Sequence, residues 1–173
     1  MFRRIYLLIL LFAIVSCTKE ELLKQMTEQE KLIEKYASTL QSEEVVVNDG
    51  VWRVVLEEGS GSYSAKAGDS VIFNYSAFIF SSGKGKIFDT SIKSVAKEAG
   101  LGMDQIFLKP RGKVVGIGEL LPGLDRGLVG VKKGEKCYLL FSSRHGFGNK
   151  QIGMVPKMSP LIYEVWITDV KQN

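Results

Sequence analysis

The side chains that usually carry acid-base, nucleophilic or metal chemistry are scarce in this sequence. Its 173 residues include one histidine, His145, and two cysteines, Cys17 and Cys137. A structural zinc site needs about four histidine or cysteine ligands, and a disulfide framework needs several cysteine pairs, so the composition argues against both. A catalytic triad could draw only on His145. The composition therefore points to a function that needs neither a metal nor a proton shuttle, and no cofactor is expected.

Aromatic side chains and one acid are the better candidates for a functional site. Tyr75 and Tyr163 each lie on the apolar face of a predicted strand, and both are expected to point to the concave side of a sheet. Asp89 directly follows Phe88 at a strand end. Because a charged side chain is costly to place beside an apolar cluster, its position suggests a specific role. Taken alone, such aromatic residues are more often simple core, and Asp89 could cap a turn.

Short runs punctuated by glycine predict the elements that position these residues. Runs rich in β-branched and aromatic residues are typical of strands. They cover residues 51–58, 71–80, 86–89, 136–142 and 161–170. One short helix is expected over 120–129, where Pro122 suits the first turn and Gly130 the C-terminal end. One helix against a mostly antiparallel sheet is an α+β architecture.

The first residues have the pattern of an export signal. An arginine pair precedes an apolar run over 5–15, which is too short to span a bilayer, since that needs roughly 20 residues. The run ends at Cys17 and resembles the bacterial lipoprotein signal. This resemblance implies a signal peptide over 1–16, cleavage before Cys17 and acyl chains on Cys17. Thr18 is not an aspartate, so the expected location is the cell envelope, lipid-anchored in the outer membrane. The alternatives are an ordinary signal peptide or an uncleaved anchor.

Residues 17–49 are expected to form a lipidated N-terminus and a charged helical tether. The stretch 18–49 contains no glycine or proline, and it holds eight acids and four bases. Apolar residues recur in it at helical spacing, which predicts one or two helices. The simpler reading is a solvated stalk between membrane and domain. A dimerising helix is the alternative, although the apolar stripe covers few heptads. The oligomeric state stays open.

Seven motifs occur in the order that one protein family shows. They are Ala67-Gly68-Asp69-Ser70-Val71, Tyr75, Phe88-Asp89-Thr90-Ser91, Leu120-Leu121-Pro122-Gly123-Leu124, Gly130-Val131-Lys132-Lys133-Gly134-Glu135-Lys136, Gly146-Phe147-Gly148 and Val155-Pro156. Over residues 50–171 the chain therefore resembles FKBP-type peptidyl-prolyl cis-trans isomerases. Together with the N-terminal cysteine, it resembles the FKBP-type lipoproteins of Bacteroidetes, some of which are associated with gliding motility.

The resemblance implies an FKBP-like half-barrel, in which an antiparallel sheet wraps around one short helix with an apolar pocket between them. It also implies a peptidyl-prolyl cis-trans isomerase acting on proline-containing polypeptide clients. By motif position, the residues expected in catalysis are Tyr75, Phe88, Asp89, Leu121, Leu124, Phe147 and Tyr163, and those expected to bind substrate are Leu120 and Val155. In the family, the backbone N–H at the position of Leu121 donates to a substrate carbonyl.

Two positions depart from the family pattern. Leu124 stands where most members have tryptophan, which leaves the pocket apolar but less filled. Phe147 stands where tyrosine is usual, so a hydroxyl that contacts bound carbonyls is missing. Both changes argue against tight macrolide binding.

The segment 88–123 is longer than in compact family members. A helix is expected within it over 91–100, with Ser91 as its cap. Phe107 is a candidate for the next pocket aromatic of the family. The basic stretch 109–113 is either a solvated turn or a rim that selects acidic or unfolded clients.

Two functions remain open at this level. The leading hypothesis is a membrane-tethered prolyl isomerase for exported or envelope proteins, and the alternative is a non-catalytic binding module within an envelope secretion or motility assembly. Nucleic-acid binding would rest only on the net charge of +4, and the export signal argues against it. His145 is expected on a surface loop near the pocket rim. Cys137 alternates with Leu139 and Phe141, so it is expected to be a buried, inert thiol.

Overall fold

The structure is a computed structural model that describes residues 2–102 and 108–173, with side chains from Lys19 onward. Phe107 lies outside the described residues. The elements in chain order are α1 (Phe2–Ala37), β1 (Glu44–Asn48), β2 (Val51–Glu57), β3 (Ser70–Phe80), β4 (Lys84–Thr90), α2 (Lys93–Glu98), β5 (Arg111–Val114), α3 (Pro122–Gly127), β6 (Lys136–Phe141), the 3₁₀ turn η2 (Ser143–His145) and β7 (Leu161–Lys171).

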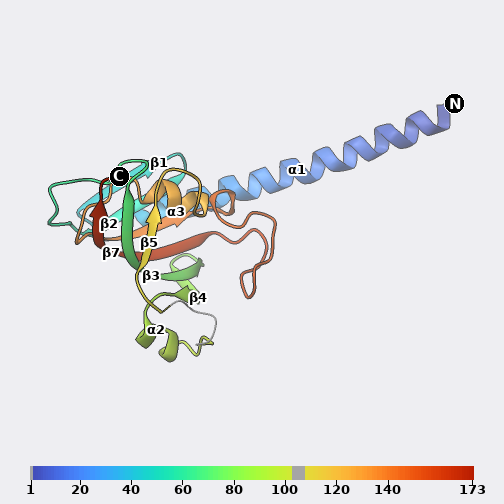
Figure 1. Cartoon of the computed structure of the whole chain (residues 1–173). Coiled ribbons are helices and arrows are strands. Elements are labelled where there is room, and N and C mark those ends of the chain that lie inside the picture. The colour runs from blue at the N-terminus through green and yellow to red at the C-terminus, as the bar shows by residue number, and fades with distance from the viewer. Residues whose placement is uncertain (1, 103–107) are drawn as a thin grey trace.

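The strands of the described chain form one seven-stranded antiparallel sheet (Figure 1). Their order is β1-β2-β6-β7-β3-β4, and β5 pairs with the first part of β3. The longest pairing joins β3 to β7 and places Ala77 opposite Tyr163 and Tyr75 opposite Val165. Because side chains alternate along a strand, Tyr75 and Tyr163 point to the same face of the sheet, as the sequence predicted.

Apolar side chains cover both faces of this sheet. On one face, α3 packs through Leu124 and Leu128 against a core that includes Phe73 and Tyr75. On the other face, Phe80 belongs to a second core. The two faces of β3 thus contribute to different cores, and the expected α+β half-barrel is the observed fold.

The second core lies between the sheet and the C-terminal half of α1, so this half of the helix packs against the sheet and is not solvated. Ile33 and Ala37 are 0% and 2% exposed, and the Tyr36 ring meets Phe80 edge to face at 5.6 Å between centroids. The C-terminal half of the helix is thus part of the folded domain, and the prediction of a solvated stalk does not describe this half. Its first half projects from the domain (Figure 1). Among the described residues, no helix combines the length and apolarity that crossing a membrane requires.

The stretch predicted as helical also contains a strand. Residues 45–47 are three consecutive valines, and they form β1, which pairs with β2. Asp49 and Gly50 between them have φ of 46° and 74°, the left-handed values that a two-residue hairpin turn requires. The sheet therefore begins at Glu44, upstream of the domain boundary expected at residue 50.

The two short helices form within the predicted ranges, but each begins and ends at other residues than predicted. Pro122 begins α3 and Leu121 is its N-cap residue, so the helix is shorter than the expected 120–129. Within the expected 91–100, α2 covers Lys93–Glu98, but Ser91 does not cap it. The Ser91 hydroxyl instead accepts the Tyr75 N–H at 2.9 Å. The expected loop 109–113 is partly regular, since β5 begins at Arg111.

His145 is buried, and its expected place on a surface loop is wrong. It is 6% exposed, and its Nδ1 lies 2.9 Å from Nη1 of Arg126. A guanidinium can only donate, so Nδ1 is the unprotonated acceptor. Burial, followed by the nearby Arg126 charge, lowers the pKa of His145. The prediction for Cys137 is confirmed, because this thiol is fully buried and burial raises its pKa.

Candidate active site

Two adjoining cavities lie on the face of the sheet that carries α3. Their volumes are about 530 Å³ and about 220 Å³. Asp89 and Tyr163 line both, so the two cavities are parts of one site. The larger cavity is also lined by Phe88, Phe147 and Val155.

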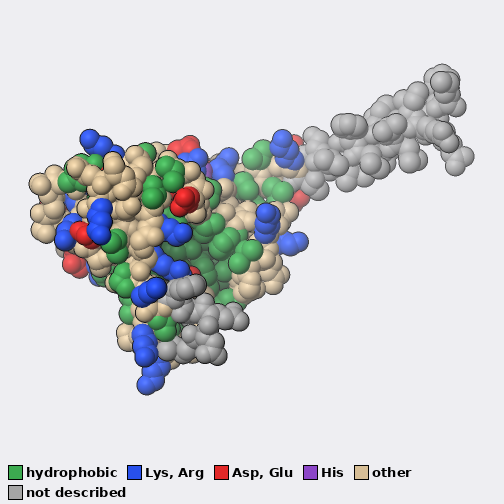
Figure 2. All heavy atoms as spheres, in the orientation of Figure 1, with side chains coloured by type: hydrophobic (Ala, Val, Ile, Leu, Met, Phe, Trp, Pro, Cys, Tyr) green, Lys and Arg blue, Asp and Glu red, His purple; other side chains and the backbone are tan. Residues whose placement is uncertain are grey.

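The smaller cavity is lined by the remaining residues that the family motifs predicted for the pocket. These are Tyr75, Leu120, Leu121 and Leu124. The structure thus brings all nine expected pocket residues to one site. Figure 2 shows hydrophobic side chains exposed in the hollowed middle of this face, with Lys and Arg side chains beside them.

Aromatic rings from separate strands meet around Tyr163. Its ring centroid lies 6.1 Å from Phe88, 5.8 Å from Tyr75 and 5.8 Å from Phe141. Phe88 in turn meets Phe147 edge to face at 6.3 Å. These contacts join β3, β4, β6 and β7 with the segment that follows β6. The sheet pairing therefore fixes the positions of the aromatic walls.

Asp89 is held by the hydroxyl of Tyr75, which donates to Asp89 Oδ2 at 2.7 Å. Burial, reinforced by this hydrogen bond, raises the pKa of Tyr75 to about 12. The hydroxyl therefore stays protonated and remains a donor near neutral pH. Asp89 lies within β4, opposite Ala77, so the alternative of a turn-capping aspartate is wrong. The result is a fixed carboxylate where the two cavities meet.

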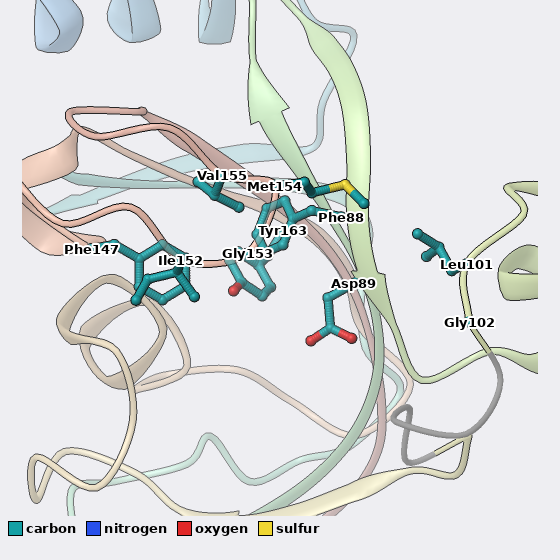
Figure 3. A pocket seen from close by; sticks show the side chains of 10 residues that line it. All are labelled: Phe88, Asp89, Leu101, Gly102, Phe147, Ile152, Gly153, Met154, Val155 and Tyr163. Atoms are coloured by element: carbon teal, nitrogen blue, oxygen red, sulfur yellow. The ribbon is translucent and has the colours of Figure 1, made fainter.

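The Tyr163 hydroxyl opens onto the larger cavity (Figure 3). The residue is 4% exposed, and burial strongly raises its pKa, so the hydroxyl stays protonated. The site therefore keeps a hydroxyl group although Phe147 lacks one.

Several rim residues were missed from the sequence. Leu101, Ile152 and Met154 line the larger cavity, and Ile152 and Met154 are about half exposed. Figure 3 shows Phe147 and Ile152 on one side of Asp89 and Leu101 on the other. These residues lie in irregular segments without periodicity, so their apolar character among glycines was the only signal. Arg111 and Lys113 line the smaller cavity and make part of its rim basic.

Cys17 is separate from this site. It belongs to the first half of α1 and is not among the residues that line the two cavities, and its side chain is outside the described residues. Within the described ranges, no cluster of histidine, cysteine or acidic residues is placed to hold a metal ion.

An antiparallel sheet around one short helix, with an aromatic cavity between them, is the architecture of the FKBP class of proteins. Residues 61–168 match the family described as FKBP-type peptidyl-prolyl cis-trans isomerase. The chain belongs to this family, and it is a peptidyl-prolyl cis-trans isomerase of the FKBP type.

Individual relatives agree with this assignment. FK506-binding protein 1A of Neurospora crassa is 32% identical over 124 residues, which cover 71% of this chain and 90% of the relative. A peptidyl-prolyl cis-trans isomerase of Schizosaccharomyces pombe is 27% identical over 117 residues, covering 67% and 90%. The crystal structure of FkpA from Escherichia coli superposes with a TM-score of 0.59 at 24% identity, covering 95% of this chain and 70% of FkpA. That likeness shows a shared fold.

Proposed function

We propose that this isomerase accelerates X-Pro isomerisation in exported or envelope proteins, from a lipid anchor at Cys17 in the outer membrane. The N-terminal sequence pattern supports the location. The observation that carries the mechanism is the Asp89 carboxylate, which Tyr75 holds where the two aromatic-lined cavities meet.

The chemistry that such a cavity can perform follows from amide resonance. Rotation about an X-Pro bond has a barrier of about 18–20 kcal/mol because twisting removes the resonance. The twisted amide has less charge separation than the planar one, so a dry apolar cavity destabilises the planar ground state relative to the transition state. No proton has to move between enzyme and client. Stabilisation by a preorganised environment is therefore sufficient.

The larger cavity can bind the proline ring of a client, and a backbone N–H beside it can bind the client residues that flank the proline. Phe88, Phe147 and Tyr163 surround the larger cavity with ring edges and faces. Leu121 is the N-cap residue of α3, so its N–H lies outside the hydrogen-bond ladder of the helix and is placed to donate to a client carbonyl. The Tyr163 hydroxyl is a second donor at the cavity. Asp89 supplies a fixed negative charge beside the twisting amide.

The test of the catalytic part is an X-Pro tetrapeptide isomerisation assay on the full chain and on Phe88→Ala. The substitution removes ring contacts with Phe147 and Tyr163, each worth about 0.5–1.5 kcal/mol, and kcat/KM is expected to fall by about 10- to 100-fold. Asp89→Leu is expected to lower it as well. Phe78→Ala is the matched control, because Phe78 packs on the opposite face of the sheet.

An unmodified chain that is no more active than Phe88→Ala and Asp89→Leu would exclude catalysis at this cavity. The chain would then fit the non-catalytic binding module, which Leu124 and Phe147 favour. If Phe78→Ala loses as much activity as Phe88→Ala, the loss reflects general destabilisation.

The anchor is tested separately by metabolic labelling with a radioactive fatty acid in the native cell. The full chain is expected to take up label and to fractionate with the outer membrane, whereas Cys17→Ala is expected to remain unlabelled. A labelled Cys17→Ala variant, or an unlabelled parent chain, contradicts the anchor and leaves the isomerase assignment intact.

A further inference from the structure

One wall of the larger cavity is carried by the segment 142–160, which joins β6 to β7 and is called the pocket loop here. Phe147, Ile152, Gly153, Met154 and Val155 all lie in it. Residues 152 and 155 pair with each other at its tip. The position of this loop therefore decides the shape of the cavity on that side.

The loop closes on itself at a narrow neck. Gly148 donates its N–H to the Ser143 carbonyl at 3.0 Å, and Met158 donates its N–H to the Gly148 carbonyl at 2.9 Å. Met158 has a φ of 57°, a left-handed conformation that a residue with a side chain adopts only where its surroundings hold it. The neck therefore depends on contacts that fix Ser143 and Met158.

A side chain of α1 supplies such contacts at both ends of the neck. The Gln29 Nε2 donates to the Met158 carbonyl at 2.6 Å, and its Oε1 accepts the Ser143 N–H at 2.9 Å. Gln29 is 7% exposed. A primary amide offers a donor and an acceptor at a fixed separation, which is what a backbone N–H and a backbone carbonyl require. One buried amide thus joins the two ends of the pocket loop.

The next residue of the helix adds contacts at the first end. Glu30 Oε1 accepts from Ser142 Oγ and from Arg144 Nε, each at 3.0 Å. One turn later, Ile33 fixes the helix on the sheet by burial. The helix is therefore held in place by apolar packing, independently of the Gln29 amide.

We propose that Gln29 is a positioning residue for the isomerase reaction. It acts through Ser143 and Met158, and it holds the pocket loop in the position that forms one wall of the larger cavity. The N-terminal helix then belongs to the machinery of the active site, in addition to any part it has in carrying the domain. This role rests on the isomerase activity of the cavity and on no property of the anchor.

The first test compares Gln29→Leu with Gln25→Leu in the full chain. Gln25 is exposed one turn earlier on the same helix, so it is a control for the substitution itself. Leucine at 29 leaves the Ser143 N–H and the Met158 carbonyl without partners, while Ile33 still seats the helix. We expect kcat/KM of Gln29→Leu to fall about tenfold, chiefly through KM, because the loop loses its preorganisation. We also expect faster amide hydrogen exchange at Ser143 and Met158.

The second test uses Gln29→Glu, which varies the hydrogen bonds without changing the size of the side chain. A carboxylate accepts the Ser143 N–H but cannot donate to the Met158 carbonyl, whereas a protonated carboxyl group does both. The activity of Gln29→Glu relative to the unmodified chain is therefore expected to rise as the pH is lowered from about 8 to about 5. If Gln29 served only to dock the helix on the domain, the relative activity of Gln29→Glu would not depend on pH in this way.

The proposal is overturned if Gln29→Leu matches Gln25→Leu in kcat/KM and in amide exchange, or if the relative activity of Gln29→Glu is flat across this pH range. An inactive unmodified chain would instead reject the proposed function. In that case the exchange rates at Ser143 and Met158 still decide whether Gln29 holds the loop.

Discussion

Phe141→Ala is expected to lower the free energy of unfolding by about 3–5 kcal/mol, the cost of removing a large aromatic side chain from a close-packed core. Phe141 is fully buried and stacks on Tyr163 with an angle of 18° between the rings. On its other side, Gly123 of α3 lies so close that a Cβ there would overlap the ring. The ring is therefore the layer between the helix and the cavity floor. Equilibrium unfolding in urea measures the loss.

The same substitution is expected to reduce isomerase activity, because Tyr163 loses the ring that supports it. Phe78→Ala provides the comparison, since Phe78 is only partly buried and lies on the opposite face of the sheet. Its loss of stability is expected to be clearly smaller. Equal losses for the two variants would contradict the placement of Phe141 at the centre of the core.

Arg53→Met is expected to cost about 3–5 kcal/mol of stability, because it leaves a buried charge without its partner. Arg53 Nη1 lies 3.3 Å from Glu135 Oε1, and both side chains are less than a tenth exposed. The other oxygen of Glu135 accepts the Lys132 N–H at 3.1 Å. The pair therefore ties β2 to the turn that follows α3. Thermal and urea unfolding measure the effect.

The double variant Arg53→Met/Glu135→Leu separates charge from packing. Since a buried ion pair gains little over an apolar pair of similar volume, the double variant is expected to be more stable than Arg53→Met alone. A double variant that is less stable than the single one would show that the carboxylate is satisfied without Arg53.

Local pattern was enough to predict the elements around the cavity. The apolar face of the predicted strand placed Tyr75 on the core side of the sheet, and Pro122 marked the start of α3. The motifs named nine residues that line the two cavities. These features depend on neighbours in the chain or on a fixed order of motifs, so one sequence carries them. The catalytic roles of the nine residues stay predictions until the variants are assayed.

Contacts between segments that are distant in the sequence could not be predicted from the local pattern of apolar and polar residues. An apolar stripe over α1 has the same spacing whether it faces solvent, a second helix or the sheet, so Ile33 gave no sign of its burial. His145 is buried and contacts Arg126 of α3, which is 19 residues away in the chain, so its own loop gave no sign of its burial. Leu101 and Met154 lie in irregular loops, where only the folded chain shows that they face one cavity. Polar residues such as Gln29 gave no signal, because an amide on a charged helix resembles a solvated side chain.

The docking of α1 also sets an order of events during folding. Gln29 is separated by 114 residues from Ser143 and by 129 residues from Met158. The surface that receives the helix is built from β2, β3, β6 and β7, and β7 is the last strand of the described chain. Contacts of such high sequence separation form slowly, because a long loop must close before they stabilise anything. The docking of α1, and with it the Gln29 contacts that hold the pocket loop, therefore requires β7 to be in its place in the sheet.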